Sequence, residues 1–253
     1  MSNHEPTNLT RRKKFFMAPF LDNLSIIVPV AAGDSSWINL LLGLDTLSPQ
    51  TEIIFSSSAP PAKAYQEKLK QFCENRPVHW IHSSPGRGKQ LNNGAACSKR
   101  KNLWFVHADS LITKYTLNAL ETTLGNYPNT IVYFDLGFSD GSPLMNLNTI
   151  GGWFRSHILG LPFGDQGLCM SKDIFEKVGG FREDVRYGED HLFVWQAKQK
   201  RVALKCTNKI LLTSARKYCD QGWVNTTARH LGLTFRQAFP EYLRLMQTRV
   251  KGL

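Results

Sequence analysis

The sequence predicts an α/β domain with a mostly parallel central sheet flanked by helices. Short apolar, β-branched runs alternate with helical segments from the first strand onward, and the early strands are apolar along most of their length. Such strands are typical of parallel sheets that are buried on both faces. Because helical crossovers join parallel strands, ligands are expected outside the carboxyl ends of these strands.

The first half of the chain alternates strand and helix. Residues Leu24–Val30 form an apolar run that contains a proline, as suits a buried parallel strand. Residues 35–47 place Trp37 and several leucines at helical spacing. By the same criteria we expect strands at 52–55, 78–82 and 103–107 and helices at 61–74, 89–98 and 113–123.

The second half is less regular. The run at 131–138 alternates less cleanly and is predicted as a strand of a mixed sheet. The tail from 223 to 250 is amphipathic, basic and predicted to be helical. We also expect a last strand at 203–210 and helices at 146–159, 173–178 and 189–200.

Composition indicates one domain with appendages. With 253 residues, 42% hydrophobic, the chain can bury a large core. We expect an α/β domain at 24–220, a basic and aromatic lead-in at 1–23, and an amphipathic helical extension at 221–253. The five cysteines are scattered without a C-x-x-C pair, which predicts neither a disulfide framework nor a structural zinc site. No signal segment or apolar run of about 20 residues occurs, so a cytoplasmic protein is expected.

The net charge of +11 favours phosphate-bearing ligands, anionic lipid or nucleic acid. No base-stacking signature accompanies the charge, so nucleic acid is not an expected partner. Basic residues 11–14 run into aromatic residues, and the tail joins arginines to apolar side chains, so the termini are candidates for peripheral membrane contact at the inner face. The alternatives are packing on the parent domain, which we favour for both segments, and a homodimer contact made by the tail.

The predicted strand at 103–107 leads into His107-Ala108-Asp109. A carboxylate at the end of a parallel strand must meet water, a donor or a cation, because burying it unpaired costs too much. A divalent metal that bridges two phosphates, Mg²⁺ or Mn²⁺, would suit it. The alternative is an aspartate that caps the helix after it.

A glycine-bounded basic turn opens the predicted helix at 89–98. Its glycines, its exposed amides and the cations Arg87 and Lys89 are typical of an anion site. The spacing is not that of a Walker loop, and a plain surface loop is the alternative.

Three further segments carry polar or charged side chains. The turn at 162–167 is rich in glycine and holds a polar pair. Glu189 and Asp190 open a predicted helix, where acids are usually solvated charges favoured by the helix dipole. One of the two could instead deprotonate an acceptor hydroxyl. Arg216 and Lys217 follow the last strand, where cations could balance the charge of a departing nucleoside diphosphate.

Taken in chain order, these segments resemble the family-2 glycosyltransferases of the GT-A fold, and within them a small subgroup of soluble bacterial members. The resemblance covers about Leu24 to Lys217. It is carried by Ser25–Val30, Gly86–Ala95, His107–Asp109, Gly164–Gly167, Gly179–Phe181, Glu189–Asp190 and Thr213–Arg216.

The resemblance implies an inverting displacement at the anomeric carbon of a nucleotide-diphosphate sugar, a uridine one by family habit. Asp109 would bind Mg²⁺ or Mn²⁺ as the carboxylate of a D-x-D motif, with His107 at its first position as a second metal ligand. Asp190, or alternatively Glu189, would be the general base that activates an unidentified acceptor. On the donor side the resemblance adds Pro29, Val30, Arg87, Lys89, Asn92 and Arg216, and in the acceptor or sugar pocket Gly164, Asp165 and Gln166.

Two segments depart from the family pattern on the nucleotide side. Ala31–Asp34 replaces the usual Asn-Glu pair, and Phe55–Pro60 lacks the acid of the turn after the second strand. Asp34 is a candidate substitute. The departures favour a catalytically silent GT-A domain that binds nucleotide, sugar or a partner protein, whereas Asp109 and Asp190 favour the enzyme. A nucleotidyltransferase is a third alternative, although its glycine-rich signature is poor after the first strand.

Overall fold

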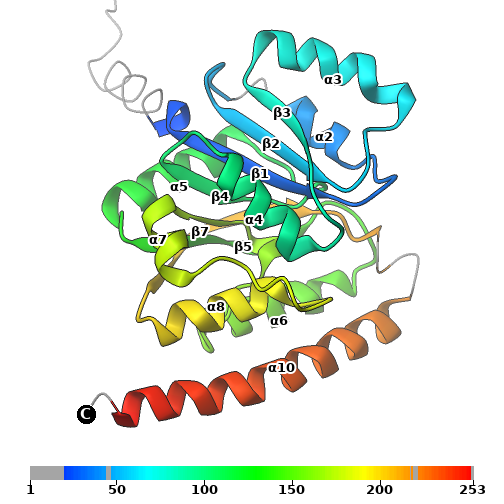
Figure 1. Ribbon diagram of the computed structural model, residues 1–253. Coiled ribbons are helices and arrows are strands. Elements are labelled where there is room, and N and C mark those ends of the chain that lie inside the picture. Colours follow the sequence, from blue (N-terminus) through cyan, green and yellow to red (C-terminus); the bar gives the residue numbers. More distant parts are fainter. Residues whose placement is uncertain (1–19, 44–46, 217, 219–221, 252–253) are drawn as a thin grey trace, which may run out of the picture.

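Figure 1 shows a computed structural model of the chain, which describes residues 20–43, 47–216, 218 and 222–251. Residues 1–19 of the predicted lead-in, with their basic and aromatic run, therefore lie outside the described residues. At the centre of the described part, seven strands form one sheet in the order β3-β2-β1-β4-β6-β5-β7. The strands are β1 (Leu24–Val30), β2 (Glu52–Ser57), β3 (Val78–His82), β4 (Asn102–Phe105), β5 (Thr130–Phe138), β6 (Leu168–Ser171) and β7 (Ala203–Thr213).

The sheet is parallel except at β6. Strands β1 to β4 pair in parallel, and so do β5 and β7, while β6 runs antiparallel to both β4 and β5. The predicted α/β class with a mostly parallel sheet is thus confirmed, and so is the mixed-sheet position of β5. The strand Leu168–Ser171 was not predicted from the sequence, because its four residues are too few to show a period.

Helices cover both faces of the sheet (Figure 1). Alternate side chains of each strand point to opposite faces, so Ile26 and Val28 join one apolar cluster while Ile27 joins the other. Helices α2 (Trp37–Leu42), α3 (Lys63–Asn75) and α5 (Lys114–Asn126) pack into the first cluster. The second cluster takes in side chains of α4 (Arg87–Cys97), α7 (Lys172–Val178) and α8 (Glu189–Gln199). Helix α6 (Met145–His157) lies against β5 on that same side, where the Tyr133 hydroxyl donates to the Ser156 carbonyl.

The C-terminal tail is a single helix, α10 (Trp223–Lys251), which runs along the outside of α8 (Figure 1). It is attached by side chains on one edge: Gln199 donates to the Glu241 carboxylate at 2.8 Å, and Leu245 is buried against α8. The predicted helical tail is therefore confirmed, and it packs on the parent domain along one face.

A buried acid ties the amino-terminal ends of the first strands together. Glu52, only 1% exposed at the start of β2, accepts hydrogen bonds from the Ser25 hydroxyl and, at 2.9 Å, from the backbone N–H of Lys99. The His79 ring on β3 lies 3.8 Å from the other carboxylate oxygen. Because each of these partners comes from a different segment, the Glu52 side chain links β2 to β1 and to the turn before β4.

We predict that Glu52→Ala destabilises the protein by about 1–3 kcal/mol, because the part-buried Lys99 N–H loses its acceptor and the buried Ser25 hydroxyl keeps only the Ser98 hydroxyl as a partner. Glu52→Gln keeps one acceptor oxygen and should recover part of this loss. Urea denaturation measures both variants, with Glu67→Ala on the exposed face of α3 as the control. A Glu52→Ala variant as stable as the control would contradict this role for Glu52.

Candidate functional site at the carboxyl edge of the sheet

Loops that follow three strands meet at the carboxyl edge of the sheet. Asp109 follows β4, and the Thr213 hydroxyl at the end of β7 donates to its carboxylate at 3.1 Å. Arg216, just beyond β7, lies 3.4 Å from the carboxylate of Asp34 in the loop after β1. We call Asp34, Asp109, Thr213 and Arg216 the edge group. It combines carboxylates with one exposed cation, which is a composition suited to a phosphate and its counter-ion.

Asp109 is partly compensated within the edge group. Burial raises the pKa of its carboxyl above the ordinary value, while the Thr213 hydrogen bond and the Arg216 charge oppose that rise. Asp34 acts in the same direction as burial, because a second negative charge nearby disfavours ionisation. An added cation would therefore stabilise the ionised form of Asp109.

A second group of charges is held between α4 and α8. The Arg87 Nε atom, in the first turn of α4, lies 3.0 Å from a carboxylate oxygen of Glu189 at the start of α8. The same guanidinium contacts Nε2 of His107. We call Arg87, His107, Glu189 and Asp190 the buried charge group. It joins the start of α8 to two segments that lie 80 or more residues earlier in the chain.

The pKa values of the two adjacent carboxylates of this group shift in opposite directions. Asp190 accepts from the backbone N–H of Gly164 at 2.6 Å and of His191 at 2.8 Å. Burial acts to raise the pKa of Asp190, but the Arg87 charge and these hydrogen bonds outweigh it and hold this pKa below its ordinary value. Burial and the neighbouring Asp190 raise the pKa of Glu189, which Arg87 only partly offsets. Asp190 is therefore the carboxylate that stays ionised.

Two glycines of the sequence motifs permit this close approach. A Cβ atom at position 164 would lie 2.8 Å from the Asp190 carboxylate and 3.2 Å from His107 Nε2. At position 88 a Cβ would lie 2.2 Å from the Arg182 carbonyl oxygen. Since neither space holds a methyl group, glycine at 88 and 164 is a packing requirement of the site.

A small cavity lies beside the buried charge group. Five of the residues predicted for the site line it, namely Pro29, Arg87, His107, Gly164 and Asp190. Its remaining walls are apolar, from Leu91, Phe105, Val106, Leu168 and Phe181. Its volume of about 10 Å³ is enough for about one water molecule, so it is a solvent-sized gap beside Asp190 and not a pocket that holds a sugar.

Other residues predicted for the donor side have structural partners. The Asn92 amide donates to the Phe181 carbonyl and accepts from the Phe181 N–H, both at 2.8 Å, so it clamps the loop after α7. Val30 is buried, and its carbonyl accepts from the Gln90 side chain at 2.9 Å. Lys89 is half-buried in the first turn of α4. The contacts of Asn92 and Val30 hold α4 in place. Neither residue lines the cavity.

The predicted pocket residues Gly164–Gln166 form a single 3₁₀ turn before β6. Gln166 is fully buried, donates to the Phe134 carbonyl at 2.8 Å and accepts from the Phe163 N–H at 3.1 Å. It therefore fastens the turn to β5, in place of the predicted pocket role. Burial raises the pKa of Asp165, and the Arg155 charge opposes that rise.

Arg155 is a site residue that the sequence analysis missed. Its guanidinium lies 3.3 Å from the Phe163 ring centroid, donates to Gln166 at 2.9 Å and lies 3.9 Å from the Asp165 carboxylate. The available signal was a single arginine on an otherwise uncharged helix, which indicates a specific buried partner.

The edge group fits Mg²⁺ or Mn²⁺ better than the predicted pair does. Both ions prefer oxygen ligands and are commonly held by one or two carboxylates together with substrate phosphates. Asp109 supplies such an oxygen, and Asp34 lies across Arg216 from it. The Nε2 atom of His107 contacts the guanidinium of Arg87, so this nitrogen would have to leave that contact to bind a metal. The expectation that His107 binds the metal stays a prediction.

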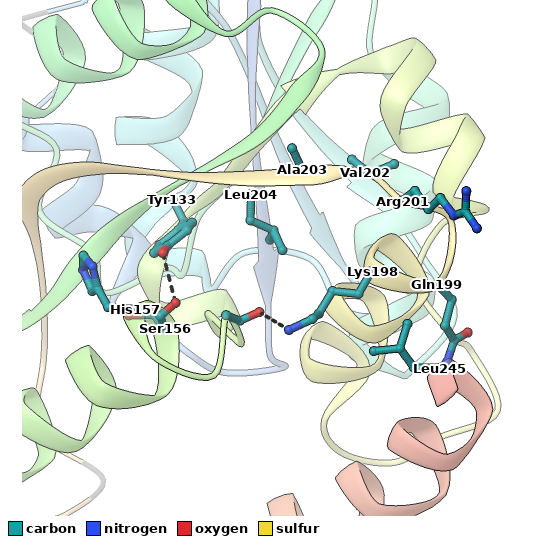
Figure 2. A pocket seen from close by; sticks show the side chains of 11 residues that line it. Tyr133, Ser156, His157, Lys198, Gln199, Arg201, Val202, Ala203, Leu204 and Leu245 are labelled. Carbon is teal, nitrogen blue, oxygen red and sulfur yellow. Dashed lines mark hydrogen bonds between the residues drawn. The ribbon is translucent and has the colours of Figure 1, made fainter. Parts of the chain in front are cut away.

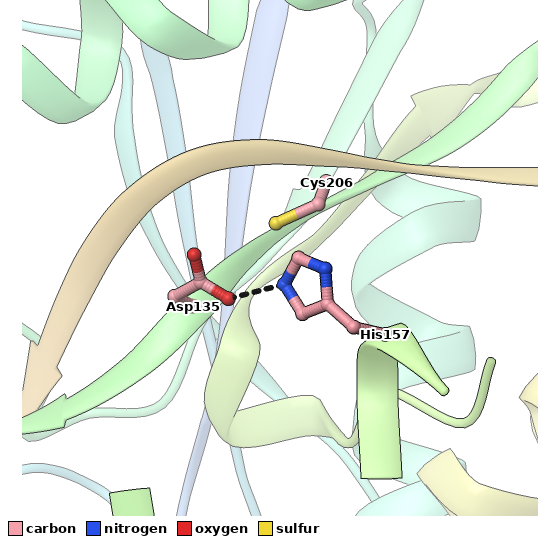
Figure 3. Close-up of side chains that lie close together, drawn as sticks. All are labelled: Asp135, His157 and Cys206. Carbon is pink, nitrogen blue, oxygen red and sulfur yellow. Dashed lines mark hydrogen bonds and ion pairs between the residues drawn. The ribbon is translucent and has the colours of Figure 1, made fainter. Parts of the chain in front are cut away.

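Within the described residues, one cluster has three side chains able to hold a metal together: Asp135, His157 and Cys206, between β5, α6 and β7 (Figure 3). The His157 ring already lies 2.7 Å from the Asp135 carboxylate. Burial raises the pKa of the Cys206 thiol to about 11, so the sulfur is neutral at physiological pH. The cluster is therefore a hydrogen-bonded histidine and aspartate beside a thiol, and its nitrogen and sulfur atoms are poorly suited to Mg²⁺.

A larger cavity of about 830 Å³ opens near the amino end of β7, between α6, α8 and α10 (Figure 2). Tyr133, His157, Lys198 and Leu245 are among its lining residues. In Figure 2 the Tyr133 hydroxyl donates to the Ser156 carbonyl. The Lys198 ammonium donates to the Gly160 carbonyl at 3.3 Å. None of the residues predicted for the site lines this cavity.

Comparison with solved structures shows the GT-A fold. S. aureus TarS aligns with a TM-score of 0.61 at 15% identity over 76% of this chain. The mannosyltransferase PcManGT from Pyrobaculum calidifontis, in complex with GDP-Man and Mn²⁺, aligns with a TM-score of 0.62 at 17% identity over 90% of this chain. TarS 1–349 in complex with UDP-GlcNAc gives 0.59 and 14% over 76% of this chain.

The chain spans 37% of the length of TarS, 58% of the TarS 1–349 complex and 68% of PcManGT. No protein-family model matches the sequence, and no curated protein matches it. At this level of identity the likeness establishes the fold, and the chemistry has to be argued from the site.

We predict opposite pH dependences for two neighbouring substitutions. The raised pKa of Glu189 means that its stabilising contribution is complete below about 4.5 and is lost as pH rises through the folded-state value. Glu189→Gln should therefore gain stability relative to wild type as pH increases above 4.5. The lowered pKa of Asp190 means that its contribution is present above about 3.8 and is lost as pH falls through the folded-state value.

Asp190→Asn should accordingly be destabilised at neutral pH, and the deficit should shrink in acid. Urea denaturation of wild type and both variants, from acid below about 3.8 to neutral pH, measures how much each variant differs from wild type in its free energy of unfolding. Slopes of the same sign for the two variants would show that the pair does not titrate as we describe.

Proposed function

We propose that the chain is an inverting glycosyltransferase that moves a sugar from a nucleotide-diphosphate donor to an acceptor hydroxyl. The main support is an ionised, buried carboxylate, Asp190, on the wall of a cavity at the carboxyl edge of a GT-A sheet. The edge group, which carries the phosphate-binding character, lies at the same edge. In a parallel sheet this edge is where ligands bind.

The edge group would receive the diphosphate. Mg²⁺ or Mn²⁺, held by the Asp109 carboxylate, would supply positive charge to the leaving group. Arg216 is 57% exposed and can turn from Asp34 toward a phosphate, to two of whose oxygens a guanidinium donates parallel hydrogen bonds. Asp34 would then stand near the donor in place of the acid that is missing after β2.

Asp190 would act as the general base. Two backbone N–H groups fix its carboxylate, and the lowered pKa keeps it ionised at neutral pH. Glu189 is the second choice, because Arg87 lies 3.0 Å from one of its carboxylate oxygens and because its raised pKa makes it less readily ionised than Asp190. A base on the face opposite the leaving diphosphate gives a direct displacement and hence inversion.

Uridine is the proposed donor base, from the sequence resemblance. The solved neighbours hold UDP-GlcNAc in one case and GDP-Man in another, so the fold accommodates both bases. The serines that follow Phe55 replace the usual acid of that turn, and this specific departure supports the second candidate, a silent GT-A domain that binds ligand without turnover.

We predict that a nucleoside diphosphate binds in a metal-dependent way and that Asp109→Ala weakens this binding at least tenfold. The reason is the loss of the carboxylate that would hold the ion between protein and diphosphate. Calorimetric titration with UDP and GDP, each with and without Mn²⁺, measures the effect. Asp173→Ala, an exposed acid on α7, is the matched control. Equal affinity with and without Mn²⁺ would reject the metal assignment.

We predict that Asp190→Asn lowers turnover by about 10²–10⁴-fold and changes nucleotide affinity little, because it removes a base and no phosphate contact. The assay follows donor consumption and, by NMR, the anomeric configuration of the product. Glu189→Gln should retain more activity than Asp190→Asn. Nucleotide binding without turnover in the wild type, across a broad set of acceptors, would favour the silent domain.

A further inference from the structure

Exposed apolar side chains concentrate on two helices. Of the nineteen large hydrophobic side chains exposed in the described part, α6 with its flanking residues carries seven and α10 carries seven. Phe235 is 74% exposed, Leu231 65% and Ile150 63%. Scattered single residues of this kind are normal, but such a concentration on two helices indicates a surface that contacts something apolar.

On each helix these side chains form one stripe. In α10, Leu231, Phe235, Phe239 and Tyr242 follow one another at intervals of three or four residues. In α6, residues 147, 150, 154 and 158 do the same. Such spacing places each set on one side of its helix.

The stripe on α10 faces away from the protein. The opposite edge of α10 holds Glu241 and Leu245, both buried, and Gln237, which donates to the Tyr187 carbonyl at 2.7 Å. At the start of α10 the Trp223 indole donates to Asn148 of α6 at 2.7 Å. The two helices therefore begin side by side and lie on the same side of the sheet (Figure 1).

The charge on this surface has one sign. Arg229, Arg236 and Arg244 of α10 are exposed. The only acid in either helix is Glu241, which is 5% exposed and receives a hydrogen bond from Arg244 at 2.7 Å. The surface thus combines aromatic and aliphatic side chains with arginines and lacks exposed carboxylates.

This charge pattern distinguishes between two occupants. A second copy that packed the same surface against itself would bring Arg229 and Arg236 toward like charges with no exposed acid to pair them. An anionic bilayer neutralises the same arginines and takes up the apolar stripe. No helix in the described residues is long and apolar enough to cross a membrane, so the contact would be interfacial.

We propose that the outward faces of α6 and α10 form an interfacial docking surface for an anionic lipid bilayer. Phe235 and Phe239 enter the boundary between headgroups and acyl chains, and Arg229 and Arg236 contact anionic headgroups. This surface is separate from the buried charge group and the edge group, so vesicle binding does not depend on the proposed transferase activity.

The test is sedimentation of the full chain with vesicles of phosphatidylcholine alone or mixed with phosphatidylglycerol. We expect at least tenfold stronger binding to the anionic vesicles, and at least a tenfold loss in the double variant Phe235→Ser with Phe239→Ser. Tyr115→Ser is the matched control, since Tyr115 is 80% exposed on α5 and outside the surface. Unchanged binding of the double variant would overturn the proposal, because it would move the contact to another part of the chain.

A charge variant tests the electrostatic half of the proposal. Arg236→Glu should weaken binding to anionic vesicles severalfold, whereas Lys70→Glu on exposed α3 should not. Brominated lipid should quench Trp153 of α6, 47% exposed, and Trp153→Phe should remove that signal. Equal losses in both charge variants would mean that net charge alone drives binding. A wild-type dimer that the double variant disrupts, with no vesicle binding, would assign the surface to a second copy; either result overturns the proposal.

Discussion

The ion pair between the half-buried Arg87 and the buried Glu189 is the interaction on which the rest of the site depends. Two adjacent carboxylates at the start of α8 would be costly to bury without a cation, and Arg87 is the cation whose charge lowers the pKa of Asp190 and limits the rise for Glu189. Its guanidinium also contacts His107, so one side chain joins the glycine turn, the loop after β4 and α8. Without the Arg87 charge, Glu189 and Asp190 would lie next to these segments without the cation that now compensates them.

The antiparallel strand β6 serves the same arrangement from the other side. It lies between β4 and β5, and the turn that enters it carries the Gly164 N–H to the Asp190 carboxylate. Gln166 and Arg155 hold that turn against β5 and the Phe163 ring. Because β6 runs antiparallel, the turn that enters it lies at the carboxyl edge of the other strands and brings the Gly164 N–H there. A parallel strand would instead end at this edge and lead into a crossover helix.

Much of the fold was predictable because long elements leave a periodic pattern. The strands Leu24–Val30 and Val78–His82 lie where the apolar runs indicated, and the helices begin and end within a few residues of expectation. β6 was missed because four residues carry no readable period. The site motifs were found as segments, but neither Asn92 nor Gln166 could be separated from ligand-binding residues in advance. Their partners are backbone groups of Phe181 and Phe134, and only the packed structure brings those together. Arg155 was missed for the same reason.

The contact between Gln237 and the Tyr187 carbonyl has a consequence for the C-terminal helix. Tyr187 precedes the start of α8 by two residues, and the Arg229 guanidinium lies 5.5 Å from its ring centroid. Helix α10 therefore holds the segment that leads into Glu189 and Asp190, although α10 contributes no residue to the cavity beside Asp190. A chain cut before Trp223 would keep Glu189, Asp190 and Arg87. It would lose the contacts of Gln237 and Arg229 with Tyr187, which hold the segment just before α8. The C-terminal helix thus belongs to the scaffold of the site as well as to the outer surface.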